Sequence, residues 1–531
     1  MVKKNGEKTK YVLAIDHGTS GIKAALVSVY GEIVDFEYEK TPIYFLPGGG
    51  AEQDPEDWWD GLTATSRRLV EKGLVPVEDI VAVCCSSTFS STVVVDSDGK
   101  HMMNSLTWMD SRGAPYIKKV VGGFPSIDGY SVFTMLPWIH KTAGGPQLSG
   151  KDDIAHVLFV KYERPDIYEK AHMFMGSKDY LNLRLTGEFA ASYDSIMLFW
   201  VTNTRNINDI SYDDSLIRKL KIDKNKLPPL KQSVDVLGTV SKDVAESMGI
   251  GPDVKVVMGS PDHQAACLGS GAVRDFEGHI YIGTSSWIQC IVPFKKTDMF
   301  HSIASLPTSI PGKYYAVNEQ DIAGGCLPFL AENILFNKNE LQTAEPPDDL
   351  YILMDKVAAE IPAGSDKLIF TPWLNGERTP VDDTTVRGGI HNMSMTTTSA
   401  HIIRAFLEGV AYNNRWALGY VEKFIGRRMD TLNIIGGGAK SELWCRIFAD
   451  VLNRNIRQVE DPIESNARGA AFIAGVALGY IEFDDIPDLV KYTRTFEPDP
   501  KNRKIYDELF GEFLKIYKNN KAMYKRLNGL V

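Results

Sequence analysis

Residues 14–23 read AIDHGTSGIK and are flanked by two short apolar runs, YVLAI and AALVSV. Apolar runs on both sides of a glycine-containing turn predict a β-hairpin with its polar residues near the tip. A hairpin turn needs only two residues, yet this one carries four further polar side chains: Asp16, Thr19, Ser20 and Lys23. The stretch is either a plain polar turn or a phosphate-binding loop. In the second case backbone N–H groups and hydroxyls face an anion, Lys23 adds charge and Asp16 faces a metal ion.

The bulk composition narrows the class of protein. A chain of 531 residues is too long for one hydrophobic core and predicts about two to four domains. Its formal net charge of −10 argues against a surface that binds nucleic acid. The six cysteines form no CxxC pair, which predicts reduced thiols in a cytoplasmic protein.

Targeting and membrane segments are not expected. The basic start MVKKNGEKTK is followed by a five-residue apolar run that ends at Asp16, which is too short for a signal peptide. No stretch approaches the ~18 consecutive apolar residues of a membrane span. We therefore predict no membrane partner.

The first hairpin has an echo in the second half of the chain. HIYIGTSSWIQCIVPF at 279–294 again places two apolar runs around a polar glycine turn. Strands alternate with helices elsewhere in the sequence, which predicts an α/β arrangement. The echo indicates two related domains that face each other, so that both turns could grip the phosphates of one nucleotide.

Two further stretches are rich in glycine. TLNIIGGGAKSELW at 431–444 predicts a strand, a turn and a helix, and the turn could approach a base or ribose. It lacks the third glycine of GxGxxG, and the chain has no GxxxxGK[ST] phosphate loop. SNARGAAFIAGVALG at 465–479 predicts a helix against which another backbone packs closely.

Nine motifs, in chain order from about residue 11 to 480, resemble the FGGY family of carbohydrate kinases and most closely its xylulokinase-like branch. They are AIDHGTSGIK, EQDPEDWW, TWMDSR, SKDYLNLRLTGEF, GSPDHQAACLGSGA, YIGTSS, WLNGERTP, VRGGIHNMS and LNIIGGGAKSELW. The resemblance implies two actin-like (ribonuclease-H-like) α/β domains, at 10–271 and 272–531, with the active site in the interdomain cleft. It also implies ATP and Mg²⁺ as cofactors.

The resemblance assigns roles to residues at the nucleotide site. Asp16 matches the carboxylate that attends the magnesium ion. The residues expected to bind ATP are Thr19, Ser20, Lys23 and Thr284 at the phosphates, and Gly437, Gly438 and Ser441 at the adenine and ribose end.

Asp262 in SPDHQAA matches the general base of the family. An Asp at this position is also a common first residue of a helix, where it interacts with the helix dipole. The two interpretations are compatible, because we expect the helix N-terminus to keep the carboxylate ionised and ready to accept a proton. In phosphoryl transfer the protein mostly positions the reactants and neutralises charge.

The predicted sugar site is where this chain departs from its relatives. Asp110 and Arg112 match residues near the sugar, although both could simply begin a capped helix. Xylulokinases carry Gly-Gln-Met-His where this chain has CCSSTFSS, so Phe89 and Ser90 replace the Met-His pair. His263 stands where close relatives have Asn. We therefore predict a small sugar or polyol as substrate, with D-xylulose a poor substrate or not the best one.

Other parts of the sequence leave alternatives open. Glu377 and Arg378 in GERTP are expected to form an ion pair that fixes a loop or joins the domains, rather than to act in catalysis. An actin-like ATPase switch and a catalytically inactive sugar sensor remain alternatives to the kinase. A homodimer also remains open. Sugar-stimulated ADP formation would separate the kinase from both other classes.

Overall fold

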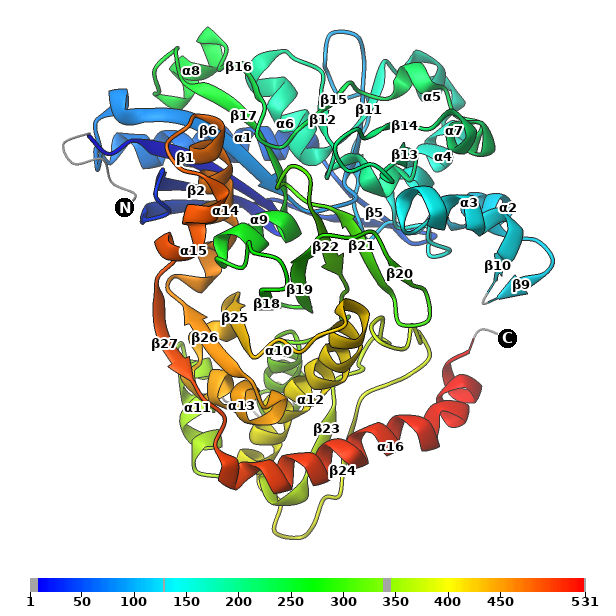
Figure 1. The fold of residues 1–531 in the computed structure, drawn as a ribbon, viewed down its shortest axis with the longest axis vertical. Helices are drawn as coiled ribbons and strands as arrows, with labels where there is room; N and C mark the ends of the chain where they lie inside the picture. The colour runs from blue at the N-terminus through cyan, green and yellow to red at the C-terminus, as the bar shows by residue number, and fades with distance from the viewer. Residues whose placement is uncertain (1–7, 128, 338–344, 530–531) are drawn as a thin grey trace.

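A computed structural model describes residues 8–127, 129–337 and 345–529 of the chain. Figure 1 shows the N-terminal half, blue to green, above the C-terminal half, green to red. Each half is built around a mixed β-sheet with helices packed on it. This confirms the predicted two-domain α/β fold.

The N-terminal sheet has six strands in the order β16-β17-β6-β1-β2-β3. The predicted hairpin is present, with β1 antiparallel to β2 and the tip between Gly18 and Gly21. Strand β6 lies parallel to β1 on its other side, and β17 lies parallel to β6. The strands are β1 (Tyr11–Gly18), β2 (Gly21–Ser28), β3 (Ile33–Lys40), β6 (Ile80–Ser87), β16 (Val236–Thr239) and β17 (Lys255–Pro261).

The C-terminal sheet has eight strands in the order β20-β21-β22-β19-β18-β25-β26-β27. At its centre β18 is antiparallel to β19 and parallel to β25, which is parallel to β26. The strands are β18 (Gly278–Ile282), β19 (Ser286–Val292), β20 (Thr297–Asp298), β21 (Ile303–Pro307), β22 (Tyr314–Val317), β25 (Thr431–Ile435), β26 (Asn455–Val459) and β27 (Tyr492–Phe496).

The two sheets repeat one topology. The order β3-β2-β1-β6-β17 in the first sheet corresponds to β22-β19-β18-β25-β26 in the second, with the same antiparallel and parallel pairings. The sequence echo is therefore the trace of two related domains. Because the hairpins occupy equivalent places, their polar tips lie at equivalent ends of the two sheets.

Helices join and cover the strands. Asp54 caps α1 by accepting a hydrogen bond from the N–H of Glu56 at 2.9 Å, as the DPEDWW motif predicts. The main helices are α1 (Pro55–Glu71), α4 (Asp153–Glu163), α6 (Ser177–Thr186), α9 (Asp262–Gly269), α11 (Leu350–Ala359), α12 (Ser399–Ile425), α13 (Glu442–Leu452), α14 (Ser465–Ala477) and α16 (Arg503–Asn528).

The N-terminal half also carries a large insertion between β6 and β17. It contains several short helices and three strands (β7, β8 and β11) of a second, five-stranded sheet, ordered β11-β7-β8-β5-β4. The other two strands of this sheet, β4 and β5, come before β6 in the chain. The strands of this sheet are β4 (Tyr44–Leu46), β5 (Gly50–Gln53), β7 (Thr92–Val95), β8 (Ser105–Leu106) and β11 (Met173–Gly176). This insertion carries Asp110 and Arg112.

Helices α9 and α14 meet backbone to backbone. A Cβ atom added at Gly269 would lie 1.8 Å from the carbonyl oxygen of Ser465, and one added at Gly469 would lie 1.9 Å from that of Ala265. Helix α14 also packs on β1, β6 and β17 of the N-terminal sheet. The predicted close approach is thus confirmed, and it joins the two halves of the molecule.

The structure agrees with two expectations drawn from composition. All six cysteines are buried and unpaired. Within the described residues, no helix has both the length and the apolar character needed to cross a membrane.

Candidate active site

The first hairpin brings Asp16 to the boundary between the two halves. Ser86 on β6 donates a hydrogen bond to Oδ1 of Asp16 at 2.7 Å. Asn466 on α14 approaches both carboxylate oxygens, at 3.4 and 3.5 Å. The partly exposed carboxylate therefore keeps capacity for a further partner on Oδ2.

A single carboxylate of this kind fits a magnesium ion that travels with phosphates. Mg²⁺ in such sites is held by one or two carboxylates together with substrate phosphates and water, rather than by a cage of protein ligands. Across the described residues, no group of three or more His, Cys, Asp or Glu side chains could hold a metal ion by itself. Asp16 is thus a suitable protein ligand only in the presence of bound phosphates.

Lys23 lies opposite Asp16 in the hairpin register. Its ammonium is 3.5 Å from a carboxylate oxygen of Glu464, just before α14, and 5.3 Å from the centre of the Phe36 ring. The structure therefore pairs Lys23 with an acid from the other half of the chain. Its charge is therefore shared with Glu464.

The tip of the first hairpin is held by its carbonyl groups. Gln53 donates to the carbonyl oxygen of Thr19 at 3.0 Å, and the Tyr38 hydroxyl donates to that of Ser20 at 2.9 Å. The Thr19 hydroxyl accepts a hydrogen bond from the indole N–H of Trp108 at 3.0 Å. A Cβ at Gly21 would lie 2.2 Å from the Glu39 carbonyl oxygen, so this position requires glycine.

The second turn, between β18 and β19, is braced in a similar way. Its exposed residue Thr284 accepts hydrogen bonds on its carbonyl oxygen from the N–H groups of Ala323 and Gly325, at 2.8 and 3.2 Å. The Thr284 side chain remains exposed. Both turns are thus fixed through backbone carbonyls, and Ser20 and Thr284 remain exposed.

Asp262 is the first residue of α9, directly after β17. Its Oδ1 accepts a hydrogen bond from the N–H of His263 at 2.9 Å. Burial raises the pKa of Asp262 well above its usual value, and the negative charges of Asp16 and Glu319 raise it further. Burial and charge repulsion therefore oppose the ionised form that we expected the helix N-terminus to favour.

The causes of the raised pKa also indicate which charged residues act on Asp262. Asp16, on the first hairpin, and Glu319, after β22, both act electrostatically on Asp262. The site therefore combines residues from both halves. A cation or a bound group that offsets this negative charge would favour the ionised form of Asp262.

Asp110 is fully buried and holds Arg112 in place. Its carboxylate accepts hydrogen bonds from the N–H of Ala51 at 3.0 Å, the N–H of Arg112 at 2.9 Å and the Arg112 guanidinium. Arg112 also pairs with Glu52 at 2.6 Å and lies over the ring of Phe159 at 4.5 Å. Asp110 acts as a support, and only Arg112 is partly exposed.

An aromatic column stands beside Asp262. His263 stacks on Trp287 with ring centres 4.0 Å apart, and Trp287 stacks on Tyr281 at 3.9 Å. Phe89 meets the other side of His263 edge-on at 5.5 Å. Because Trp287 and Tyr281 belong to β19 and β18, the column crosses from one half to the other.

A hydrogen bond from Gln289 determines which ring nitrogen of His263 carries the proton. Gln289 donates a hydrogen bond to Nδ1 of His263 at 2.7 Å, which leaves the proton of the neutral ring on Nε2. Burial lowers the pKa of His263 to about 3, so the ring is neutral at physiological pH. Ser90 directly follows Phe89 in the sequence. It is buried and has a left-handed φ of 52°.

The third glycine-rich turn has a different construction. Gly437 is exposed and a Cβ there would touch nothing within 4 Å, whereas a Cβ on Gly438 would lie 2.4 Å from the side chain of Ile282. Ser441 caps α13 by accepting a hydrogen bond from the N–H of Trp444 at 2.9 Å. The Ser441 hydroxyl is therefore already engaged within the protein.

The GERTP loop does not contain the predicted ion pair between Glu377 and Arg378. Arg378 pairs with Glu319 and Asp321. The buried carboxylate of Glu377 instead accepts hydrogen bonds from the N–H of Asp321 at 3.1 Å and from Asn413 at 2.5 Å, and burial raises its pKa to about 8. The loop-fixing role is correct, but the partners are different.

Sequence reasoning missed several residues that the structure brings to this site. Glu319 and Asp321 follow β22 in the polar stretch NEQD. Polar residues directly after a strand could have been recognised as candidate site residues. Glu464 and Asn466 lie at the start of α14, where only the glycine content drew attention. Their positions beside Lys23 and Asp16 depend on the packing of the two halves.

Comparison with known proteins agrees with this arrangement. Sequence models of the N-terminal and C-terminal domains of the FGGY family of carbohydrate kinases match residues 11–269 and 278–478. A xylulose kinase of Staphylococcus epidermidis is 27% identical over 96% of this chain and 97% of its own length. A gluconokinase of Bacillus subtilis is 27% identical over 98% of each chain.

A solved structure gives the same result for the fold. The ligand-bound xylulose kinase from Lactobacillus acidophilus superimposes with a TM-score of 0.84 at 26% identity. The match covers 98% of this chain and 100% of the other. The similarity therefore extends over both halves and the junction between them.

Proposed function

Because the chain belongs to the FGGY family of carbohydrate kinases, we propose that it transfers the γ-phosphate of ATP to a hydroxyl of a small sugar or polyol. Asp262 is the general base of this proposal. The observation that carries it is the position of Asp262 at the first residue of α9, directly after β17, where Asp16 of the first hairpin and Glu319 of the other half act on it electrostatically. The domains of this proposal are 10–271 and 272–531.

The nucleotide would lie between the two turns. The residues proposed to hold it are Thr19, Ser20, Thr284, Gly437 and Gly438. Asp16 would hold a magnesium ion beside the phosphates, and such an ion neutralises phosphate charge. Lys23 and Ser441 support this site indirectly, because each already has a partner in Glu464 and in the N–H of Trp444.

The chemical step needs an ionised Asp262. The sugar hydroxyl oxygen attacks the γ-phosphorus, the bond from that phosphorus to the bridging oxygen of ADP breaks, and the hydroxyl proton passes to a carboxylate oxygen of Asp262. The raised pKa of Asp262 suits a group that must take up a proton near neutral pH. Closure of the two halves would exclude water that otherwise hydrolyses ATP.

The sugar would contact the column and the supported arginine. The Nε2–H of His263 can donate to a substrate hydroxyl, Phe89 offers an apolar wall, and Arg112 offers a charged donor held by Asp110. The relatives include both xylulose kinases and gluconokinases, so likeness alone does not select one substrate. We propose that D-xylulose is not the preferred substrate.

The test is a coupled assay of ADP formation with ketoses, aldoses, polyols and aldonates, run on the wild type and on Asp262→Asn. Sugar-dependent ADP formation in the wild type, lost in the variant, supports the kinase. ATP hydrolysis that no sugar changes would favour the actin-like ATPase, and sugar binding without turnover would favour a sensor.

A further inference from the structure

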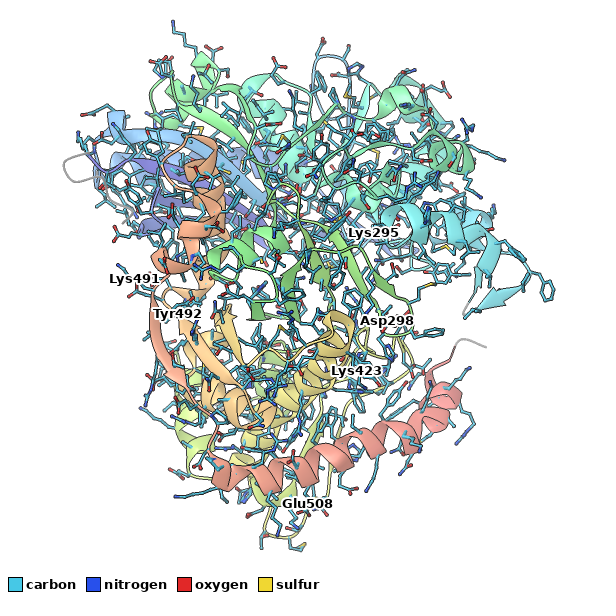
Figure 2. All side chains as sticks on the ribbon, viewed as in Figure 1. Lys295, Asp298, Lys423, Lys491, Tyr492 and Glu508 are labelled. Carbon is cyan, nitrogen blue, oxygen red and sulfur yellow. The ribbon has the colours of Figure 1, made fainter. Side chains whose placement is uncertain are left out.

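A second pocket lies in the C-terminal half, away from Asp262. It has a volume of about 340 Å³ and is enclosed by the second half of α12, the first half of α16 and the loop that follows α13. Figure 2 labels Lys423 on α12 and Glu508 on α16, which mark the two helices. None of the residues assigned above to the sugar or nucleotide lines this pocket.

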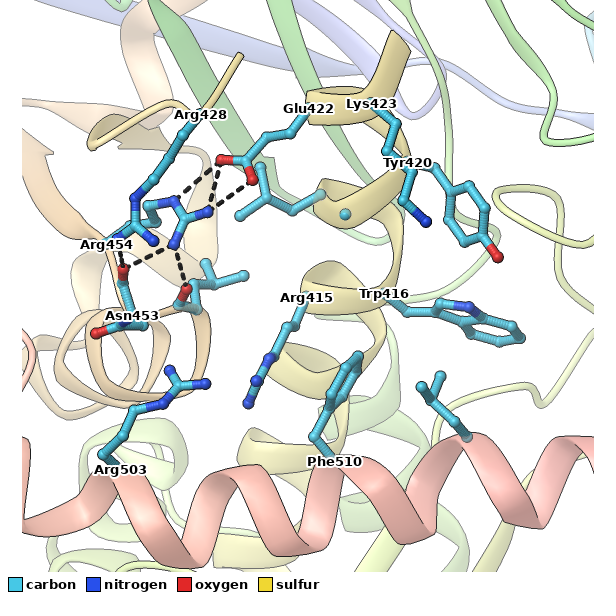
Figure 3. A pocket seen from close by; sticks show the side chains of 14 residues that line it. Arg415, Trp416, Tyr420, Glu422, Lys423, Arg428, Asn453, Arg454, Arg503 and Phe510 are labelled. Carbon is cyan, nitrogen blue, oxygen red and sulfur yellow. Dashed lines mark hydrogen bonds and ion pairs between the residues drawn. The ribbon is translucent and has the colours of Figure 1, made fainter. Parts of the chain in front are cut away.

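Positive charge dominates the lining. Five cationic side chains line the pocket, and Glu422 is the single acid among the lining residues. The cations are Arg415, Lys423, Arg428, Arg454 and Arg503. Figure 3 shows the guanidinium groups of Arg415 and Arg503 pointing toward each other across the pocket.

The acids nearby do not balance these cations. Glu422 pairs with Arg454 at 2.7 Å and Asp430 with Arg428 at 2.7 Å, while Asp507 is shared by Arg415 and Arg503. Five cations thus face three carboxylates, which leaves an excess of two positive charges. In the described part of the chain, Lys423 has no carboxylate partner; its ammonium lies 4.8 Å from the centre of the Tyr420 ring.

One guanidinium nitrogen has no partner. Nη1 of Arg503 is buried and makes no hydrogen bond, although an unsatisfied donor on a charged group is costly. Burial also lowers the pKa of Arg415, and the charge of Arg503 contributes to this lowering. Both observations indicate that positive charges lie close together at this pocket without enough negative charge to balance them. A bound anion would supply that negative charge.

Apart from Gly419 and Asn453, the rest of the lining is apolar or aromatic. The centre of the Phe510 ring lies 4.2 Å from the guanidinium of Arg415, and five further residues of this kind line the pocket. They are Trp416, Leu418, Tyr420, Leu452 and Leu514. Pockets for small molecules typically have volumes of about 300–1,000 Å³ and combine apolar walls with a few polar groups.

We propose that this pocket binds a small organic phosphate, with the phosphoryl group at the guanidinium groups of Arg415 and Arg503 and a ring or sugar against Phe510. Guanidinium groups bind phosphate oxygens in pairs, which suits two arginines that face each other. The apolar wall selects a ligand with a ring over inorganic phosphate. This site is separate from the proposed transfer reaction.

The test uses 1-naphthyl phosphate as the probe, measured by calorimetry and by the rise in Tm. The full-length protein is first saturated with a non-hydrolysable ATP analogue and Mg²⁺, so that phosphate binding in the cleft is blocked. We expect saturable binding of 1-naphthyl phosphate with a Kd below about 1 mM. Inorganic phosphate and the uncharged 1-naphthol should each bind at least about tenfold more weakly.

Variants separate this pocket from other basic surfaces. Arg503→Gln and Arg415→Gln should each weaken binding of 1-naphthyl phosphate about tenfold or more. The matched control is Lys504→Gln, which removes the same charge from an exposed neighbour on α16 that does not line the pocket. Absence of saturable binding, equal binding of 1-naphthol, or equal losses in Lys504→Gln and Arg503→Gln would overturn the proposal.

Discussion

Asp16 and Ser260 pair with the same residue, Ser86, from opposite sides of strand β6. Because Ser260 and Asp16 lie level with each other across the sheet, Asp262 lies only two residues beyond the level of Asp16. Three neighbouring strands thereby bring two carboxyl groups together without any direct bond between them. The mutual repulsion that raises the pKa of Asp262 is therefore built into the sheet.

Replacement of Asp262 should separate activity from stability. Asp262→Asn should lower kcat at least about 10²-fold, because a positioned general base is lost, while the affinity for ATP stays nearly unchanged. The same variant should have a Tm at least equal to that of the wild type, because the amide carries no charge that Asp16 could repel. Steady-state kinetics and thermal unfolding would measure both.

The control for this substitution is Asp253→Asn, which changes an exposed Asp just before β17. It should leave kcat and Tm unchanged. If Asp262→Asn kept more than about a tenth of the wild-type kcat, the assignment of the general base would be wrong.

Stability should fall as the pH rises from about 6.5 to 8.5. Burial raises the pKa of Asp152 and Asp153 to about 7 and that of Glu377 to about 8. In this window the folded protein still holds protons that the unfolded chain has released, so raising the pH favours unfolding. The buried His17 and His263, with pKa values lowered to about 3, have lost their effect above pH 6.5.

Urea denaturation at intervals of half a pH unit would measure this slope. Asp152→Asn should flatten this slope, because the variant lacks the titrating carboxyl group. Its amide oxygen can still accept the hydrogen bond that Trp200 donates at 2.7 Å to Oδ2 of Asp152. A midpoint that rises between pH 6.5 and 8.5 would contradict the prediction.

The contact between α9 and α14 should not tolerate a single methyl group. Gly469→Ala places a Cβ 1.9 Å from the carbonyl oxygen of Ala265, so the helices must separate. We expect a loss of about 1–3 kcal/mol, typical of overpacking, together with reduced kcat. Gly511→Ala on α16 is the control, because a Cβ there touches nothing within 4 Å, and it should leave Tm equal or higher. Equal Tm values for the two variants would refute the argument.

Substrate preference should depend on His263. His263→Asn removes the stacking on Trp287 and the Nε2–H donor, so the ratio of kcat/KM values for the best substrate and for D-xylulose should change at least about tenfold. The KM for ATP should not change. His140→Asn, at an exposed position, should leave the ratio unchanged. A wild-type screen in which D-xylulose came first by a clear margin would contradict the predicted preference.

Closure of the two halves should be visible in solution. Because the two turns proposed to bind phosphate lie in separate halves, both can reach one nucleotide only when the halves approach each other. X-ray scattering with an ATP analogue and the best sugar should give a smaller radius of gyration than the unliganded protein. An unchanged radius at saturating ligand would argue against closure.

Much of the fold could be predicted because its signals are local. The apolar runs around AIDHGTSGIK and YIGTSS define both hairpins, and the glycine content of 465–479 predicts the close approach at Gly469. Each of these rests on neighbouring residues in the sequence. The presence of two related domains then follows from the resemblance between the two halves.

The parts that failed depend on contacts between distant segments. The pKa of Asp262 is set by burial and by Asp16, and neither is visible in the SPDHQAA motif. Likewise, Arg378 has an adjacent acid in the sequence but pairs with Glu319 and Asp321, which the fold brings from about sixty residues away. Electrostatics of this kind is decided by packing and not by spacing along the chain.

The crossing of α9 and α14 bears on how far the proposed general base can move when the halves move relative to each other. Asp262 begins the helix that contains Gly269, so at 1.5 Å per residue it lies only about 10 Å from the contact. A rotation of the halves about this contact would displace Asp262 little, because displacement grows with distance from the axis. The proposed proton acceptor would then keep its place while more distant parts of the C-terminal half open and close.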